Sequence, residues 1–222
     1  QSYNEVNGAR GRIKYFIDNA AKYLAEEWVT TEGPTKEKIV YEPLGVIANI
    51  SAWNYPFLVG VNVFIPALLA GNAVLYKPSE YTTLTGLHIQ KLLHQAGIPQ
   101  HCFQVVVGKG NVGEHLLQLP LKGYFFTGSY QTGKYIAEAV AHKLVPCQLE
   151  LGGKDPLYVM DDVEDIDKTA AAVGFEMRNS MNGAEVNAFD VDGIALVKVV
   201  FAHVKCGLVA VCPACVVDHY VQ

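Results

Sequence analysis

Short apolar runs alternate with helix-like segments along most of this chain, and no other feature constrains its fold as strongly. The apolar, often β-branched runs predict strands at 46–51, 73–77, 103–107, 123–127, 148–151 and 157–160. Helical patterns lie between them, at 57–70, 83–96, 112–119, 132–142 and 165–175. Strands joined through helices need crossover connections, so the chain is expected to form an α/β fold, with an open parallel sheet covered by helices on both faces.

One long segment could also be read as a membrane span. Residues 43–76 contain no Asp, Glu, Lys, Arg or His, and the segment is long enough to cross a bilayer. Four asparagines and two prolines interrupt it, at Asn49, Asn54, Asn62, Asn72, Pro56 and Pro66. We therefore expect it to form a strand, a turn, a helix and a second strand in the protein core, with no membrane partner.

Composition narrows the possible partners. The chain has 222 residues, half of them hydrophobic, which suffices for one sizeable domain or for one domain and part of a second. Its formal net charge is −5 and it has no basic run, which argues against a nucleic-acid partner. Five cysteines without a secretory signal favour reduced thiols and a cytoplasmic location. The first residue, Gln1, stands in what reads as mid-helix sequence, so we expect a truncated chain.

A glutamate flanked by leucines ends one of the predicted strands. Glu150 lies between Leu149 and Leu151, and Gly152 and Gly153 follow directly. Burial would raise the pKa of such a carboxylate, which suits a general base. Paired glycines would let a substrate or cofactor approach the backbone closely. The alternative is an ordinary strand end followed by a turn.

Two glycine-rich loops follow predicted strands. The loop at 108–113 has the Gly-x-Gly-x-x-Gly spacing of a dinucleotide fingerprint, but no acidic residue ends a following strand at the expected distance. The loop at 128–135 nearly spells a nucleotide P-loop, except that Tyr135 replaces the Ser or Thr that would hold Mg²⁺. A P-loop NTPase is therefore disfavoured.

Four motifs together carry a family resemblance. They are Trp-Asn-Tyr-Pro at 53–56, Lys-Pro-Ser-Glu at 77–80, Phe-Thr-Gly-Ser at 126–129 with a glycine at 133, and Leu-Glu-Leu-Gly-Gly-Lys at 149–154. In this order the chain resembles the aldehyde dehydrogenase superfamily from about Val6 to about Val173. The resemblance implies a Rossmann-like dinucleotide-binding domain at 1–152, with a β excursion at about 27–43 for contacts in a dimer or tetramer, and an incomplete catalytic segment at 153–222.

The resemblance also implies roles for individual residues. Asn54 would stabilise an oxyanion, and Glu150 would act as the base on the nucleophile or on water. Lys77 and Glu80 would contact the adenosine ribose, and Glu80 would favour NAD over NADP by repelling a 2′-phosphate. Without the resemblance, this strand end would be read as a solvated turn. The implied cofactor contacts in full are Ser51, Ala52, Trp53, Lys77, Ser79, Glu80, Gly110, Gly113, Gly128, Ser129, Gly133 and Leu151.

The family's nucleophile has no counterpart at its usual place. The family carries a cysteine in an Asn/Gln-Gly-Gln-x-Cys setting, but residues 182–186 here read Asn-Gly-Ala-Glu-Val. Two functions stay open: NAD-dependent oxidation of a small aldehyde to its acid, or an inactive dinucleotide-binding module that acts by binding or subunit association. The cysteines at 206, 212 and 215 read as incidental thiols rather than a metal or redox site. The acidic residues at 161–167 read as a helix start.

Overall fold

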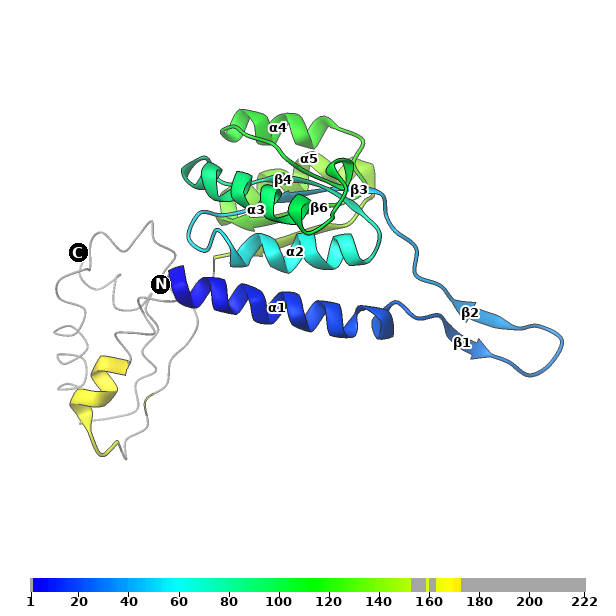
Figure 1. Ribbon diagram of the computed structural model, residues 1–222, viewed down its shortest axis with the longest axis horizontal. Coiled ribbons are helices and arrows are strands. Elements are labelled where there is room, and N and C mark those ends of the chain that lie inside the picture. Colours follow the sequence, from blue (N-terminus) through cyan, green and yellow to red (C-terminus); the bar gives the residue numbers. More distant parts are fainter. Residues whose placement is uncertain (1, 153–158, 160–162, 173–222) are drawn as a thin grey trace. The chain divides into compact units, whose positions relative to one another are not determined.

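The computed structural model describes residues 2–152, 159 and 163–172. The chain divides into two compact units, Gln1–Leu151 and Gly152–Gln222. All elements labelled in Figure 1 belong to the first unit. In the second unit residues 166–172 are helical, and the Asp165 carboxylate accepts a hydrogen bond from the Lys168 N–H at 3.0 Å. Asp165 thus caps the start of this helix, as expected for a carboxylate at that position.

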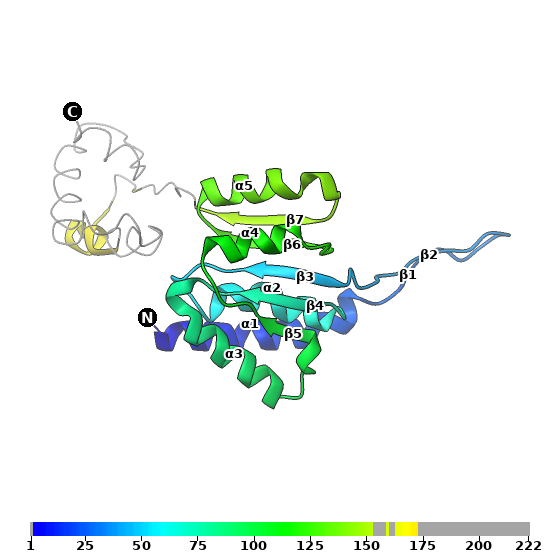
Figure 2. The ribbon, with the colours of Figure 1, turned by 90° about the horizontal axis from the view of Figure 1, so that it is seen from above.

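A five-stranded parallel sheet forms the centre of the first unit, in the order β5-β4-β3-β6-β7 (Figure 2). The strands are β3 Val46–Ile50, β4 Ala73–Lys77, β5 Phe103–Val105, β6 Tyr124–Gly128 and β7 Cys147–Leu151. From β3 the chain first builds outward through β4 to β5, then returns to build outward through β6 to β7. The topological switch point therefore lies between β3 and β6, the region where such sheets bind ligands. The predicted α/β parallel sheet is confirmed.

Helices cover both faces of this sheet (Figures 1 and 2). They are α1 Ser2–Tyr23, α2 Leu58–Leu69, α3 Thr83–Gln95, α4 Gly110–Gln118 and α5 Tyr130–Val140, with short 3₁₀ turns at Glu80–Thr82, Gln100–Cys102 and Ala141–Lys143. Neighbouring strand residues face opposite layers: Ile47 packs with α2 and α3, whereas Ala48 packs with α4 and α5. This alternation gives two apolar layers, one on each side of the sheet.

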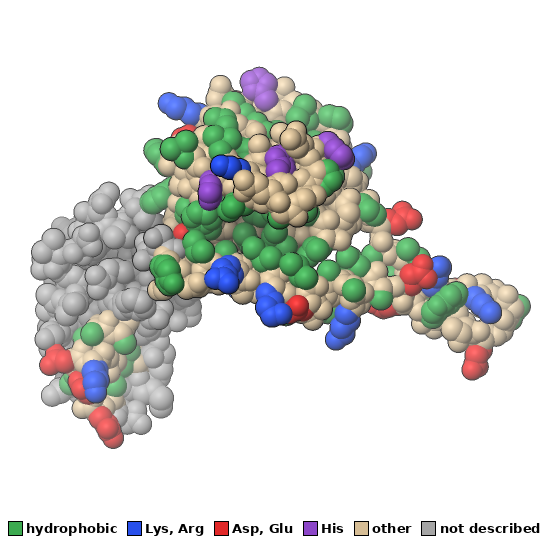
Figure 3. Space-filling view, viewed as in Figure 1, with side chains coloured by type: hydrophobic (Ala, Val, Ile, Leu, Met, Phe, Trp, Pro, Cys, Tyr) green, Lys and Arg blue, Asp and Glu red, His purple; other side chains and the backbone are tan. Residues whose placement is uncertain are grey.

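The uncharged segment 43–76 becomes β3, α2 and β4, as expected for a core unit. α2 is apolar except for Asn62, and it lies between the sheet and α1, whose Ala9, Ile13 and Phe16 pack on the same core (Figure 1). Figure 3 shows hydrophobic side chains along the seam between α1 and the rest of the unit. No helix among the described residues is long and apolar enough to cross a membrane.

Several element bounds differ from the predicted ones. The strand predicted at 103–107 ends at Val105, and the helices predicted from 112 and 132 begin at Gly110 and Tyr130. The β excursion expected at about 27–43 contains two short antiparallel strands, β1 Glu27–Thr30 and β2 Glu37–Ile39. The strand predicted at 157–160 and the end of the helix predicted at 165–175 lie outside the described residues.

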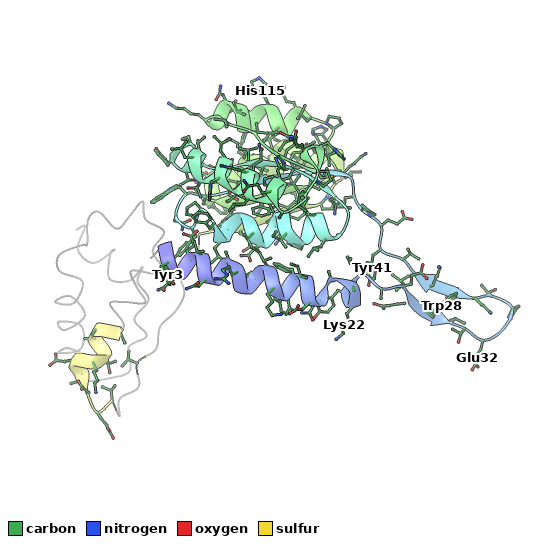
Figure 4. All side chains as sticks on the ribbon, in the orientation of Figure 1. Tyr3, Lys22, Trp28, Glu32, Tyr41 and His115 are labelled. Carbon is green, nitrogen blue, oxygen red and sulfur yellow. The ribbon has the colours of Figure 1, made fainter. Side chains whose placement is uncertain are left out.

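The β1–β2 hairpin extends away from the layered body of the first unit (Figure 1). Every residue from 21 to 44 is exposed, including Trp28 at 55% and Tyr41 at 47%. Both side chains lie on the hairpin, well away from the sheet (Figure 4). The hairpin is held by its own strand pairing and by Lys38, which donates to both Glu26 carboxylate oxygens at 2.9 Å.

Candidate functional site

The predicted site residues gather at one edge of the sheet. β3, β4, β6 and β7 are parallel, and their last residues are nearly level, since Ile50 pairs with both Lys77 and Phe126, and Gly128 pairs with Leu151. The turns that follow these strands therefore leave the sheet on its carboxyl side (Figure 2). Ligands of open parallel sheets bind on this side.

The turn after β3 carries four predicted site residues, Ser51, Ala52, Trp53 and Asn54. Ser51 is buried, and its N–H donates to the Lys77 carbonyl at 3.0 Å, which ties this turn to the end of β4. Trp53 is exposed, and its ring lies edge-on to Tyr81, with 6.4 Å between ring centroids. Ala52 and Asn54 are partly buried.

A carboxylate that sequence analysis missed holds the far end of this turn. Oε1 of Glu5, in α1, accepts hydrogen bonds from the backbone N–H groups of Phe57 at 2.5 Å and Leu58 at 3.1 Å. Two sequence signals point to it. Glu5 is an acid in line with the apolar positions Ala9 and Ile13 of its helix, and α2 begins without a Ser, Thr, Asp or Asn to cap it.

The turn after β4 brings together a buried amine and an exposed carboxylate. Lys77 is only 5% exposed, so its reading as a solvated strand-end residue is wrong. Burial lowers the pKa of the Lys77 amine from its ordinary value, while the negative charge of Glu80 acts in the opposite direction. Ser79 is buried and caps the next 3₁₀ turn by accepting from the Tyr81 N–H at 3.4 Å, and Glu80 is exposed.

The first glycine loop lies beside this amine. α4 begins at Gly110, and a Cβ at Gly113 would lie 3.7 Å from Lys77 Cε, so the stem of the lysine passes along the first turn of α4. Gly110 has open space around its missing Cβ. Gly108 has φ +158°, and a Cβ there would lie 2.2 Å from Val112. The loop thus fits a glycine-dependent turn next to Lys77.

The second glycine loop joins β6 to α5. Ser129 caps α5: its Oγ accepts from the Thr132 N–H at 3.3 Å and donates to Thr132 Oγ1 at 2.9 Å. Gly128 is the last residue of β6. Gly133 is buried, and a Cβ there would lie 2.4 Å from Leu151 Cδ2, so this glycine lets α5 lie close to β7. The start of α5, with its positive dipole end, therefore lies at the carboxyl edge of the sheet.

Glu150 does not have the expected burial. Its side chain is exposed, and its Oε1 accepts from Gln148 Nε2 at 3.2 Å. The reason is its position on β7, an edge strand. Leu149 and Leu151 face the α4–α5 layer, so the alternation turns Glu150 to the opposite face, where α2 and α3 pack on β3, β4 and β5. Glu150 nevertheless lies at the same sheet edge as the other candidate residues.

The remaining predictions concern residues outside the described part of the chain. They include Gly153, the aspartates at 161 and 162, the stretch 182–186 that lacks the expected cysteine, and the cysteines at 206, 212 and 215. The described residues contain two cysteines, Cys102 and Cys147, and neither forms a disulfide.

Comparison with known proteins agrees with this geometry. The aldehyde dehydrogenase family profile matches residues 1–182, beyond the Val173 at which the resemblance was expected to end. Betaine aldehyde dehydrogenase of Vibrio vulnificus (strain YJ016) is 44% identical over 133 residues, which are 60% of this chain and 27% of that protein.

Solved structures show the same relationship. A double mutant of betaine aldehyde dehydrogenase from Staphylococcus aureus, in complex with NAD+, superposes with a TM-score of 0.72 and 32% identity, covering 78% of this chain and 35% of that one. An NAD-dependent aldehyde dehydrogenase from Sinorhizobium meliloti superposes with a TM-score of 0.72 and 31% identity, covering 78% of this chain and 34% of that one. The chain thus spans between 27% and 35% of the length of these relatives. With the family profile matching residues 1–182, and with its motifs at the carboxyl edge of a parallel sheet, the chain belongs to the aldehyde dehydrogenase family.

Proposed function

We propose that this chain is the dinucleotide-binding part of an NAD-dependent aldehyde dehydrogenase, which oxidises a small aldehyde to its carboxylic acid. The observation that carries the proposal is the convergence of four strand-end turns, the buried Lys77 and the start of α5 at one sheet edge. Relatives that superpose on the chain include an enzyme in complex with NAD+ and one named NAD-dependent.

The residues at this edge fit a dinucleotide. The first N–H groups of α5, with the helix dipole behind them, would hold the pyrophosphate. The Lys77 amine would donate to the ribose hydroxyls, and Glu80 would accept from them. The remaining contacts to the dinucleotide would come from Ser51, Ala52, Trp53, Ser79, Gly110, Gly113 and Leu151. When bound, the nicotinamide supplies the hydride acceptor for the oxidation.

Two side chains would act on the aldehyde. The Asn54 side-chain N–H would donate to the oxyanion that forms when a thiolate attacks the carbonyl carbon. Glu150 would take the proton from the nucleophilic thiol or from the water that later releases the acid. Because the Glu150 side chain is exposed, it could reach either the thiol or the water. Asn54 lies in the turn after β3, and Glu150 is the last but one residue of β7. These two strands lie on either side of β6.

The two described cysteines do not suit the role of nucleophile. Cys147 is the first residue of β7, and Cys102 comes directly before β5, so both lie at the amino edge of the sheet, opposite the candidate site. Burial also raises the pKa of the Cys147 thiol, which lowers its thiolate fraction. Together with the lack of a cysteine at 182–186, the position of the two described cysteines favours the second candidate function, in which the chain binds the dinucleotide without turnover. We expect the isolated chain to produce little or no NADH.

Calorimetric titration of the chain with NAD+ and with NADP+ tests the proposal. We expect one saturable NAD+ site and weaker NADP+ binding, because the Glu80 carboxylate repels a 2′-phosphate. Glu80→Gln removes the charge and should narrow the preference by roughly tenfold, whereas Glu138→Gln, on the exposed side of α5, should leave it unchanged. Equal affinity for both dinucleotides in the unaltered chain would refute the assignment of Glu80. An absence of binding to a folded chain would refute the cofactor site.

An assay of NADH formation separates the two candidate functions. The chain is incubated with NAD+ and an aldehyde, with and without prior iodoacetamide treatment. NADH formation that iodoacetamide abolishes would establish a nucleophilic thiol and dehydrogenase activity for the chain itself. Saturable NAD+ binding without NADH formation would establish the binding module.

A further inference from the structure

We propose that Glu5 is a positioning residue: from α1 it fixes the turn that carries Trp53 and Asn54, by capping the start of α2. The role at the site rests on the proposed function, because Asn54 matters there as the oxyanion donor. The positioning itself rests on geometry within the first unit.

The start of α2 needs an external acceptor. The first backbone N–H groups of any α-helix have no acceptor within the helix. Here the residue at the cap position is Phe57, whose side chain makes no capping bond, and Tyr55 and Pro56 precede it. One oxygen of Glu5 accepts from both Phe57 N–H and Leu58 N–H, at 2.5 and 3.1 Å. A residue 52 positions earlier in sequence thus supplies the missing cap.

The carboxylate is held firmly in this position. Glu5 is 6% exposed, although α1 is largely exposed on its outer side, and burying a polar group is costly unless its partners compensate. The two N–H donors and the positive end of the α2 dipole provide that compensation. Ala9 lies one turn further along the same face of α1 and is buried against α2, which fixes the helix that carries the carboxylate.

The turn between β3 and α2 is therefore anchored at both ends. At its start the Ser51 N–H donates to the Lys77 carbonyl at 3.0 Å, and Trp53 contacts Tyr81. At its end Glu5 holds Phe57, which is three residues after Asn54. An oxyanion donor must lie within a few tenths of an ångström of its working position, and small misplacements cost large factors in rate. Releasing the second anchor should let the Trp53–Pro56 segment move.

Trp53 can report on the turn directly. The chain has two tryptophans, Trp28 and Trp53, so Trp28→Phe on the exposed hairpin leaves Trp53 as the sole tryptophan. In this background we would compare Glu5→Ala, Glu5→Asp and Glu5→Gln. Asp18→Ala is the matched control, since it removes an exposed carboxylate from the same helix. The readouts are Trp53 emission, acrylamide quenching, urea unfolding and the NAD+ dissociation constant.

We expect Glu5→Ala to shift Trp53 emission to longer wavelength in the folded protein and to weaken NAD+ binding by roughly tenfold, since Ser51, Ala52 and Trp53 are proposed contacts. Glu5→Asp, which is too short to reach both N–H groups, should act in the same direction with less loss of stability. Glu5→Gln keeps an acceptor oxygen at the same reach and should change Trp53 emission and NAD+ affinity less than Glu5→Ala does. Asp18→Ala should change neither readout.

The outcomes separate positioning from mere stability. If Glu5→Ala and Glu5→Asp lower the free energy of unfolding but leave Trp53 emission, quenching and NAD+ affinity unchanged in the folded protein, the proposal is overturned. If Glu5→Ala does not fold, an unaltered Trp53 signal in Glu5→Asp overturns it equally. If the unaltered chain binds no NAD+ while Trp53 still responds to Glu5→Ala, the positioning stands and the proposed function fails.

Discussion

At the scale of single residues, burial shifts the pKa of two groups next to the candidate site. Tyr76 lies in β4 with 1% of its surface exposed, and burial raises the pKa of its phenol to about 12. The neighbouring Lys77 is buried as well, and burial lowers the pKa of its amine. Both shifts have the same cause, because a low-dielectric interior disfavours the charged form of either group.

The shift of Tyr76 makes stability depend on alkaline pH. An unfolded tyrosine ionises near its ordinary pKa of 10.0, and the folded one near about 12. The stabilising contribution is therefore fully present below pH 10.0 and is lost as pH rises through about 12. Tyr76→Phe removes this dependence, so from about pH 9 to about pH 11.5 the parent should lose about 2 kcal/mol more unfolding free energy than the variant.

Urea unfolding at several pH values measures the difference. Tyr135→Phe is the control, because Tyr135 is 50% exposed and its removal should leave the pH profile of the parent unchanged. Parallel profiles for the parent and Tyr76→Phe would contradict the expectation.

At the scale of elements, close packing positions the turn after β4. Gly86 of α3 is buried against this turn, and a Cβ there would lie 2.5 Å from Cγ and 2.9 Å from Cβ of Pro78. The proline ring cannot swing away as a flexible side chain can. α3 thus lies close enough to support the segment that carries Lys77, Ser79 and Glu80.

The same substitution should have opposite effects in two helices. Gly86→Ala should destabilise the chain by about 1–3 kcal/mol, because overpacking forces α3 away from Pro78. Gly11→Ala in α1, where nothing lies within 4 Å of the added Cβ, should stabilise it by up to about 1 kcal/mol, the helix-propensity difference between the two residues. Chemical denaturation gives both values. A stabilised Gly86→Ala variant would show that the α3 contact is loose.

At the scale of the whole molecule, the β1–β2 hairpin suits contacts with a second copy of the chain. Its exposed apolar residues include Trp28, Val29, Ile39, Val40 and Tyr41. The hairpin extends from the body of its unit and buries none of its residues against the described part of the chain. We propose that it mediates homo-oligomerisation, in a dimer or tetramer.

Charge on the hairpin should prevent this association. Val29→Lys places an ammonium group on the exposed apolar surface, and we expect it to convert an oligomer into a folded monomer. Leu84→Lys is the control, because Leu84 is 82% exposed but lies on α3. Sedimentation velocity distinguishes the species. An unaltered chain that sediments as a monomer at all concentrations would remove the basis for the proposal.

Local sequence pattern determined most of the architecture. Alternating apolar runs and helical segments are local properties, so they predicted the parallel sheet. Because its strands are parallel, the motifs that follow them lie at one edge. The exposed hairpin was harder to predict. β1 has four residues and β2 three, too short for periodicity to distinguish them from loop.

Only the tertiary structure decided how these residues are surrounded. Two leucines beside Glu150 suggested burial, but its position on an edge strand exposes it, and strand order is not encoded in local periodicity. Without the family resemblance, the strand end at Lys77 would be read as a solvated turn, yet Lys77 is buried. Glu5 caps a helix whose cap position lies 52 residues later, through a contact that no local motif describes. The sequence by itself thus determined the elements of the parallel sheet and the family. Burial and long-range hydrogen bonds depend on which elements become neighbours, and that was decided by tertiary packing.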